Sequence, residues 1–273
     1  MPKRAAAVAG QFYPAAPDKL RNVVARCLDE AATAPAPDRV SAIIAPHAGY
    51  PYSGPTAGWA FRRIQGMSPH RVILLGPSHH YRFRGFSLYP GEAFETPLGD
   101  IPVDRAFVAA IAARFGSDCP EAHVPEHSLE VELPFLLAVL APGFSIVPVL
   151  FGDCPTPAHR ALATFLAESI DPGDLILAST DLSHFLTEPE ANQIDRHSLD
   201  TVLAGDPEAL ATGLRDGSCS LCGGTAVVVA LAAANLLGAR TRTEWDYRTS
   251  AWATGDPSRV VGYGGLTLES AHD

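Results

Sequence analysis

The chain has 273 residues, 47% of them hydrophobic, and a formal net charge of −10. This length and apolar content favour a single α/β domain over residues 1–273 with a sizeable core. The negative charge argues against a nucleic-acid or anionic-membrane surface, because both depend on clustered Lys and Arg. The apolar run Ala5–Ala9 is too short for a signal peptide, and no stretch approaches the ~20 apolar residues of a membrane span. We therefore expect a cytoplasmic protein.

The first part of the chain predicts a strand, a helix and a second strand. Apolar residues at helical spacing predict an initial helix over Pro17–Ala32, and Ser41–Ala45 is typical of a short buried strand. A helix over Ser53–Ile64 follows, with Pro55 in its first turn, where the missing N–H costs no hydrogen bond. The apolar run Val72–Leu75 predicts a strand buried on both faces. This order implies a parallel pair joined by a right-handed crossover.

The rest of the chain continues the alternation. An irregular β excursion is expected over Gly85–Pro102, and a helix over Asp104–Phe115 has Asp104 as its N-cap. Gly262–Gly265 indicates a bulge or a close backbone approach in the last strand. The alternation predicts an α/β fold with a mainly parallel sheet flanked by helices. The further predicted helices are Ser128–Leu140, Thr156–Ile170, Glu188–Leu203, Asp206–Leu214 and Gly223–Leu237, and the strands are Ser145–Leu150, Asp174–Ser179, Arg240–Tyr247 and Arg259–Leu268.

Polar side chains stand just after three of the predicted parallel strands. His47 follows one strand, His79 and His80 follow the next, and Asp181 and His184 follow a third. Parallel strands would bring these residues to one edge of the sheet, where α/β proteins bind ligands. Imidazole is a common metal ligand and also titrates near neutral pH. A single histidine there is explained by local capping, but three strand ends together favour a functional site.

Two segments add candidate acid–base groups. In a helical turn, Asp181 and His184 would share a face, and the carboxylate would raise the basicity of the imidazole; an N-cap Asp beside a surface His is the equal alternative. With Ser128 as a helix N-cap, the helix dipole would lower the pKa of His127 and leave a neutral imidazole facing substrate. The remaining histidines have the pattern of plain loop residues: His70, His123, His159, His197 and His272.

Five cysteines are an odd number and poor evidence for a disulfide framework. Cys27 and Cys154 are expected to be small buried residues. Cys219 and Cys222 form a C-x-x-C, which alone is a weak metal signal. Cys222 directly precedes a predicted helix, whose N-terminus would stabilise the thiolate that binds metal. Two histidines and one thiolate would leave open positions on the ion, as in catalytic sites.

Several common catalytic motifs are absent from the sequence. There is no G-x-S-x-G elbow, H-E-x-x-H, P-loop or G-x-G-x-x-G after a strand, so lipase-like and nucleotide-dependent chemistry have no motif here.

Six motifs, taken together and in this order, resemble those of the Memo family, whose bacterial and archaeal members are also called AmmeMemoRadiSam system protein B. They cover nearly the whole chain. The motifs are GQFYP (Gly10–Pro14), IIAPHAGYPYSG (Ile43–Gly54), LLGPSHH (Leu74–His80), EHSLEVELPFL (Glu126–Leu136), STDLSH (Ser179–His184) and LCGG (Leu221–Gly224).

The resemblance implies a fold like that of class III extradiol dioxygenases, which hold non-haem iron(II) with two His and one carboxylate. It places His47 and His79 as the imidazole ligands and Cys222 where the dioxygenases have a Glu. It also places His127, Asp181 and His184 in the pocket, with His184 matching the general base. His80 then becomes a pocket residue that orients a ligand or contacts substrate.

Three functional hypotheses follow. The first is a mononuclear site for a divalent metal, iron(II) before zinc or copper, with an oxidoreductase activity of the dioxygenase type on an unknown substrate. The second is a non-enzymatic module that binds a peptide or partner protein in the same cleft. The third is a redox pair formed by Cys219 and Cys222. The family name further points to a link with a radical SAM protein.

Overall fold

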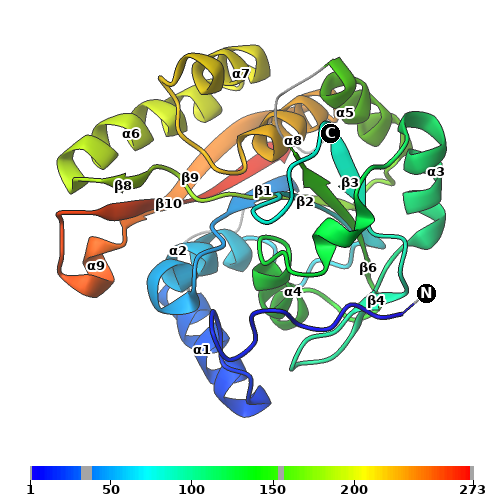
Figure 1. Ribbon diagram of the computed structural model, residues 1–273, viewed down its shortest axis with the longest axis horizontal. Coiled ribbons are helices and arrows are strands. Elements are labelled where there is room, and N and C mark those ends of the chain that lie inside the picture. The colour runs from blue at the N-terminus through cyan, green and yellow to red at the C-terminus, as the bar shows by residue number, and fades with distance from the viewer. Residues whose placement is uncertain (1, 32–38, 153–156, 271–273) are drawn as a thin grey trace.

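The computed structural model describes residues 2–31, 39–152 and 157–270. One eight-stranded sheet forms its centre (Figure 1). Its strands are β1 (Val40–Ala45), β2 (Arg71–Pro77), β3 (Phe86–Leu88), β6 (Ser145–Phe151), β7 (Leu175–Ser179), β8 (His184–Leu186), β9 (Ala239–Thr249) and β10 (Val260–Ser270); β4 (Ala93–Phe94) and β5 (Ile101–Pro102) pair separately.

The strands in the middle of the sheet run parallel, in the order β6-β2-β7-β1. At the edges, β3 pairs with β6, and β10 pairs with β1, β8 and β9, all antiparallel. β1 and β7 are buried along their whole length, whereas most of β9 is only half-buried. Continuous burial of this kind is typical of parallel strands covered on both faces. The predicted α/β fold, parallel at its centre and flanked by helices, is confirmed.

Helices cover both faces of the sheet (Figure 1). On one face, α1 (Pro17–Glu30) packs on α2 (Tyr50–Arg62), and α2 packs on β1 and β10 beside α4 (Leu133–Val139). On the other face, the apolar helix α8 (Gly224–Leu236) lies over β2 and β7. α5 (Pro157–Ser169) and α7 (Pro207–Asp216) pack on α8, whereas α3 (Arg105–Phe115) packs on β6 and α5, and α6 (Glu188–Ala204) packs on β9, β10 and α7. The one-turn helix α9 (Ala251–Thr254) lies between β9 and β10.

Most predicted elements are present within a few residues of their expected ends. The irregular β excursion and the Asp104 cap are confirmed, since the Asp104 side chain accepts the Phe107 N–H. The helix expected from Ser53 begins at Tyr50 instead, so Pro51 occupies the first turn and Pro55 lies inside the helix. The first turn of this helix tolerates proline for the predicted reason, but the proline in that turn is Pro51 and not the predicted Pro55.

The helix expected from Ser128 is shorter than predicted. A 3-10 helix covers Glu130–Glu132, and α4 begins only at Leu133. Ser128 is not an N-cap, because its hydroxyl donates to the carbonyl of Pro77 at the end of β2. The strand β8 and the helix α9 were not predicted.

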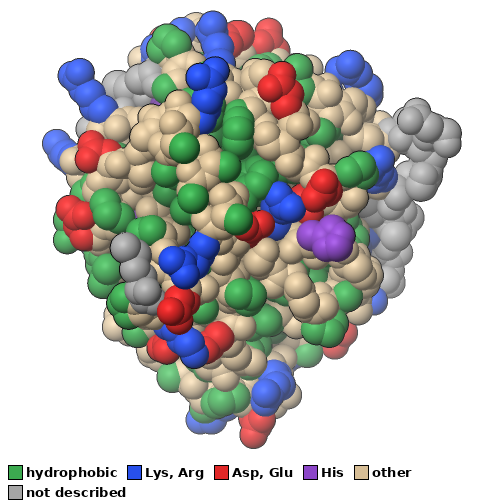
Figure 2. Space-filling model, turned by 90° about the vertical axis from the view of Figure 1, so that its right-hand side faces the viewer, with side chains coloured by type: hydrophobic (Ala, Val, Ile, Leu, Met, Phe, Trp, Pro, Cys, Tyr) green, Lys and Arg blue, Asp and Glu red, His purple; other side chains and the backbone are tan. Residues whose placement is uncertain are grey.

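On the face drawn in Figure 2, acidic and basic side chains are interspersed. No helix in the described residues is both long enough and apolar enough to cross a membrane.

The predicted irregularity at Gly262–Gly265 is confirmed in both forms. The pairing of β10 with β9 shifts register between Gly265 and Leu266. A Cβ on Gly262 would lie 1.9 Å from Oδ2 of Asp195, on α6. That carboxylate accepts the Ser183 N–H at 2.8 Å and the Tyr247 hydroxyl at 3.0 Å. Gly262 therefore leaves room for the Asp195 carboxylate, which holds Ser183 in place just before β8.

We expect Gly262→Ala to lower the free energy of unfolding by about 2 kcal/mol, because the added methyl overlaps the Asp195 carboxylate. In an Asp195→Ala background, the same substitution should cost about 1 kcal/mol less, since the clashing oxygen is gone. Urea unfolding of the four proteins of this cycle measures both values. If Gly262→Ala costs the same unfolding free energy with and without the Asp195 carboxylate, the proposed overlap between the two groups is wrong.

Candidate metal centre

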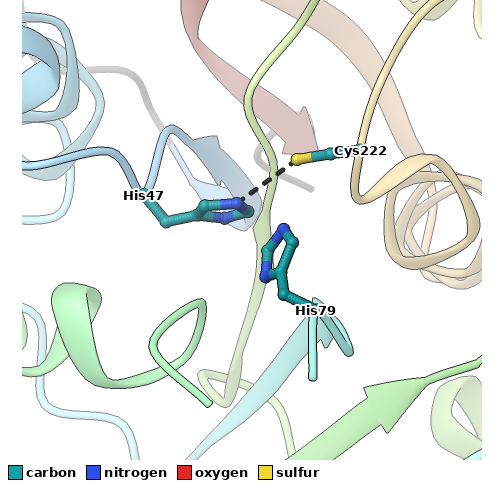
Figure 3. A group of neighbouring side chains, drawn as sticks. All are labelled: His47, His79 and Cys222. Atoms are coloured by element: carbon teal, nitrogen blue, oxygen red, sulfur yellow. Dashed lines mark hydrogen bonds between the residues drawn. The ribbon is translucent and has the colours of Figure 1, made fainter. Parts of the chain in front are cut away.

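Three side chains with metal-ligating atoms meet beyond the carboxyl ends of the parallel strands. His47 follows β1, His79 follows β2, and Cys222 lies in the turn before α8. Their ligand atoms all lie within 4.8 Å of one another. Figure 3 shows the three side chains converging from separate segments. The sequence prediction placed these residues together, and the structure does so at the edge where α/β proteins bind ligands.

The spacing and chemistry of the donors suit one divalent ion. Nε2 of His47 lies 3.3 Å from Sγ of Cys222. Two atoms that bind a common tetrahedral ion at 2.0–2.3 Å are about 3.5 Å apart. Imidazole nitrogen and thiolate sulfur are ligands for zinc, iron and copper. Three protein ligands would leave further positions on the ion open.

The other ring nitrogen of each histidine is already engaged. Nδ1 of His47 lies 2.8 Å from the Ser179 hydroxyl, and Nδ1 of His79 lies 2.9 Å from the Glu126 carboxylate. Such partners fix the ring orientation and leave Nε2 for the ion. A group formed by His79, Glu126 and His127 also has metal-ligand spacing. In this second group, however, the hydrogen bond between Nδ1 of His79 and the Glu126 carboxylate already explains why these two residues lie together.

Glu126 is a site residue that the sequence prediction missed. Its carboxylate also accepts the backbone N–H groups of His127 and Ser128, each at 2.9 Å. Burial alone would raise the pKa of this carboxyl, but hydrogen bonds from His79 and from the backbone hold the pKa below its usual range. Glu126 is therefore an anion that anchors His79. Its signal in the sequence is an acidic residue beside His127, just before an apolar stretch.

Burial keeps His47 and Cys222 neutral when no ion is bound. It lowers the pKa of His47 well below its usual value and raises the pKa of the Cys222 thiol. The S–H of Cys222 can then donate to Nε2 of His47. The predicted stabilisation of a Cys222 thiolate by the following helix is outweighed, because desolvation acts in the opposite direction. A metal ion would have to displace the thiol proton.

His127 lies against the cluster, and His80 lies farther out. The ring of His127 stacks on that of His79 at 4.6 Å and is 5.6 Å from that of His47. The exposed His80 ring is 6.2 Å from His127. Burial lowers the pKa of His127 to about 4. The predicted neutral imidazole is thus present, but desolvation rather than a helix dipole is its main cause.

The predicted helical turn that would pair Asp181 with His184 is absent. Asp181 accepts the backbone N–H of His47 at 2.9 Å, and its own N–H points at Sγ of Cys222, 3.2 Å away. His184 begins β8, and its Nδ1 lies 3.0 Å from the carbonyl of Leu182. A carbonyl can only accept, so Nδ1 carries the proton and Nε2 is free to accept one. Burial raises the pKa of Asp181 to about 7.

The two cysteines of the C-x-x-C have different surroundings. Cys219 is buried, and its sulfur lies 3.7 Å from the hydroxyl of Thr201, whereas Cys222 contacts His47. Both are free thiols, as is the buried Cys27. Cys154 lies outside the described residues.

A cavity of about 540 Å³ adjoins the cluster without containing any of the three ligands. It lies between the Gly10–Pro14 segment, α1 and the start of α2, and its apolar walls include Tyr50 and Trp252. Phe12 lines this cavity and also contacts the ring of His127 at a centroid distance of 4.7 Å. Phe12 therefore separates the cavity from the histidines.

The remaining histidines differ from the prediction of plain loop residues. His123 is 1% exposed, in a 3-10 helix, with its ring 5.6 Å from that of Tyr89. His159 is buried on α5, and His197 is exposed on α6. His70 is an exposed residue before β2, as predicted, and residue 272 lies outside the described part of the chain. The sequence around His123 shows no helical period that would have revealed its burial.

His123 should make the protein less stable in acid. Burial lowers its pKa from 6.5 to about 3. Below pH 6.5 the unfolded chain binds a proton that the folded protein excludes, so stability falls as the pH drops toward 3. Between pH 7 and pH 5, wild type should lose about 2 kcal/mol more unfolding free energy than His123→Phe. Urea unfolding at both pH values tests this, and parallel losses would refute it.

Comparison with known proteins identifies the family. A family model described as "Memo-like protein" matches residues 4–267. A MEMO1 family protein of Methanopyrus kandleri is 32% identical, with 97% of this chain and 99% of the relative aligned. MEMO1 family proteins of Aquifex aeolicus and Thermotoga maritima are 35% and 34% identical, and each alignment covers 96% of this chain and 98% of the relative. The chain therefore belongs to the Memo family.

Proposed function

We propose that the protein holds one divalent metal ion, iron(II) in its active form, on His47, His79 and Cys222, and acts as an oxidoreductase of the dioxygenase type on a small molecule. The observation that supports the metal site best is the orientation of the two imidazoles. Each is held at Nδ1, by Ser179 or by Glu126, so that both Nε2 atoms are left for the ion beside the Cys222 sulfur.

The donor set supports iron chemistry by its charge and its open positions. Two imidazoles and one thiolate carry the same charge as the two-His, one-carboxylate set of non-haem iron oxygenases. Iron held there would supply electrons and open positions for dioxygen and for an oxygen atom of the substrate. The softer thiolate also favours zinc and copper(I), so the metal content after anaerobic purification distinguishes these metals.

The chain's own residues supply the acid–base groups of the proposed reaction. His184, with Nε2 unprotonated, accepts a proton from the substrate. Asp181, whose pKa of about 7 allows both protonation states near neutral pH, holds or returns a proton. His127 stays neutral and donates or accepts a hydrogen bond. His80, exposed at the outer side of His127, contacts the substrate.

The cavity beside Phe12 favours a second candidate, a module that binds a peptide or partner protein without catalysis. Its volume of about 540 Å³ and its apolar walls suit an apolar side chain. In that case binding of the partner survives alanine substitution at His79 and Cys222. Loss of the partner together with the metal would count against this candidate.

Anaerobically purified wild-type protein should contain about one metal ion per chain by elemental analysis, because the three donors form a single site. The double variant His47→Ala with Cys222→Ala should lose it, since two of the three ligands are gone. His70→Ala and Cys119→Ser, which change the same residue types outside the cluster, serve as matched controls. Metal retained in the double variant, or far below stoichiometric in wild type, would refute the site.

Glu126→Gln should weaken metal binding by about 10–100-fold, because the neutral amide replaces the anion that orients His79. Glu121→Gln, an exposed acidic residue nearby in the sequence, is the control. Competition with a chromophoric chelator measures both affinities. Unchanged affinity in Glu126→Gln would show that His79 does not need this partner.

A further inference from the structure

We propose that Glu132 is a buried carboxylic acid that holds a proton behind His47 and releases it to solvent when a divalent cation binds. The inference rests on the proposed metal site and adds a positioning residue to it, one that acts on the ion only through His47.

Glu132 is connected to His47 by two hydrogen bonds. It ends the 3-10 helix before α4 and is fully buried. Its Oε1 lies 2.7 Å from the hydroxyl oxygen of Ser179, which in turn lies 2.8 Å from Nδ1 of His47. The other carboxyl oxygen, Oε2, has no hydrogen-bond partner among the described residues. An ionised carboxylate would leave that oxygen both charged and unsatisfied.

The number of hydrogens around Ser179 favours a proton on Glu132. The hydroxyl oxygen of Ser179 has three close neighbours: Nδ1 of His47, Oε1 of Glu132 and the carbonyl oxygen of Ser128 at 2.7 Å. A hydroxyl has one hydrogen, so Ser179 can donate fully to the Ser128 carbonyl or to Glu132, but not to both. The Ser128 carbonyl can only accept, so all three contacts are satisfied when Ser179 donates to Ser128 and Glu132 carries a hydrogen of its own. The hydrogens of the other two contacts then come from His47 and from Glu132.

The surroundings of Glu132 favour the same neutral form. Burial raises its pKa well above the usual value, the Ser179 contact lowers it, and the nearby Asp181 carboxyl raises it again. Tyr50, the other titratable neighbour, is itself kept neutral by burial and donates its hydroxyl hydrogen to the carbonyl of Val131. The neutral acid is therefore the form expected in the metal-free protein.

A bound cation reverses this preference through charge balance. Binding adds two positive charges beside His47 and Cys222, which burial keeps neutral beforehand. Ionisation of the Cys222 thiol offsets one charge, and ionisation of Glu132 offsets the other. The Ser179 hydrogen then turns from Ser128 to the new carboxylate, and His47 still donates to Ser179. One divalent cation enters, two protons leave, and the net charge of the site is unchanged.

Zinc binding followed by calorimetry tests this. At pH 8, in two buffers of different ionisation enthalpy, wild type should release about two protons per zinc and Glu132→Gln about one. Asp181, with a pKa of about 7, is mostly ionised at pH 8 before zinc is added and contributes little. Zinc affinity should fall about tenfold in Glu132→Gln. Glu121→Gln should match wild type in both respects.

Ser179→Ala keeps the acid but cuts the connection to His47, so it should also release about one proton. If circular dichroism shows that Glu132→Gln does not fold, the proton release of Ser179→Ala takes its place as the test. Zinc binding that survives His47→Ala with Cys222→Ala would overturn the metal site and the inference with it. If that double variant loses zinc while Glu132→Gln and Ser179→Ala release as many protons as wild type, only the role of Glu132 is overturned.

Discussion

A buried ion pair between Arg4 and Glu130 fixes the segment on which much of the site depends. The two side chains are 2.6 Å apart and almost completely buried. Arg4 also donates to the carbonyls of His123 and Glu126, and Glu130 accepts the N–H groups of residues 7 and 8 and the hydroxyl of Tyr13. Removing one partner of such a pair leaves an uncompensated buried charge, which costs about 3–5 kcal/mol.

This pair joins two distant parts of the sequence into one wall of the site. Glu126, His127 and Glu132 all belong to the segment that Glu130 anchors, and Phe12 belongs to the N-terminal segment that Glu130 and Arg4 hold down. The contact of Phe12 with His127 closes the arrangement. The positions of the side chains around the cluster are thus set by hydrogen bonds and charge in the loops, and the sheet sets only where those loops begin.

The sequence predicted the parts of this molecule that follow from periodicity. Buried apolar runs marked the parallel strands, and their ends correctly brought His47 and His79 together, with Cys222 added by the family resemblance. It could not reveal groups whose role depends on distant partners. Glu126 stands before the predicted N-cap Ser128, and Glu132 falls within the predicted helix Ser128–Leu140. Neither shows locally which backbone groups or hydroxyls it will meet. Likewise, Asp181 contacts the backbone of His47 across the sheet rather than its sequence neighbour His184.

The order of the strands would give a metal ion at this candidate site a mechanical role. β1 and β2 do not pair with each other, since β7 lies between them. Neighbouring strands are about 4.8 Å apart, so the two histidines bridge about twice that distance at the open ends of the strands. An ion bound by both histidines would cross-link the ends of β1 and β2. It would thereby also restrain β7, which lies between them, without binding to it. The carboxyl ends of these strands must stay accessible to a ligand. A bound ion would at the same time keep those strand ends from separating.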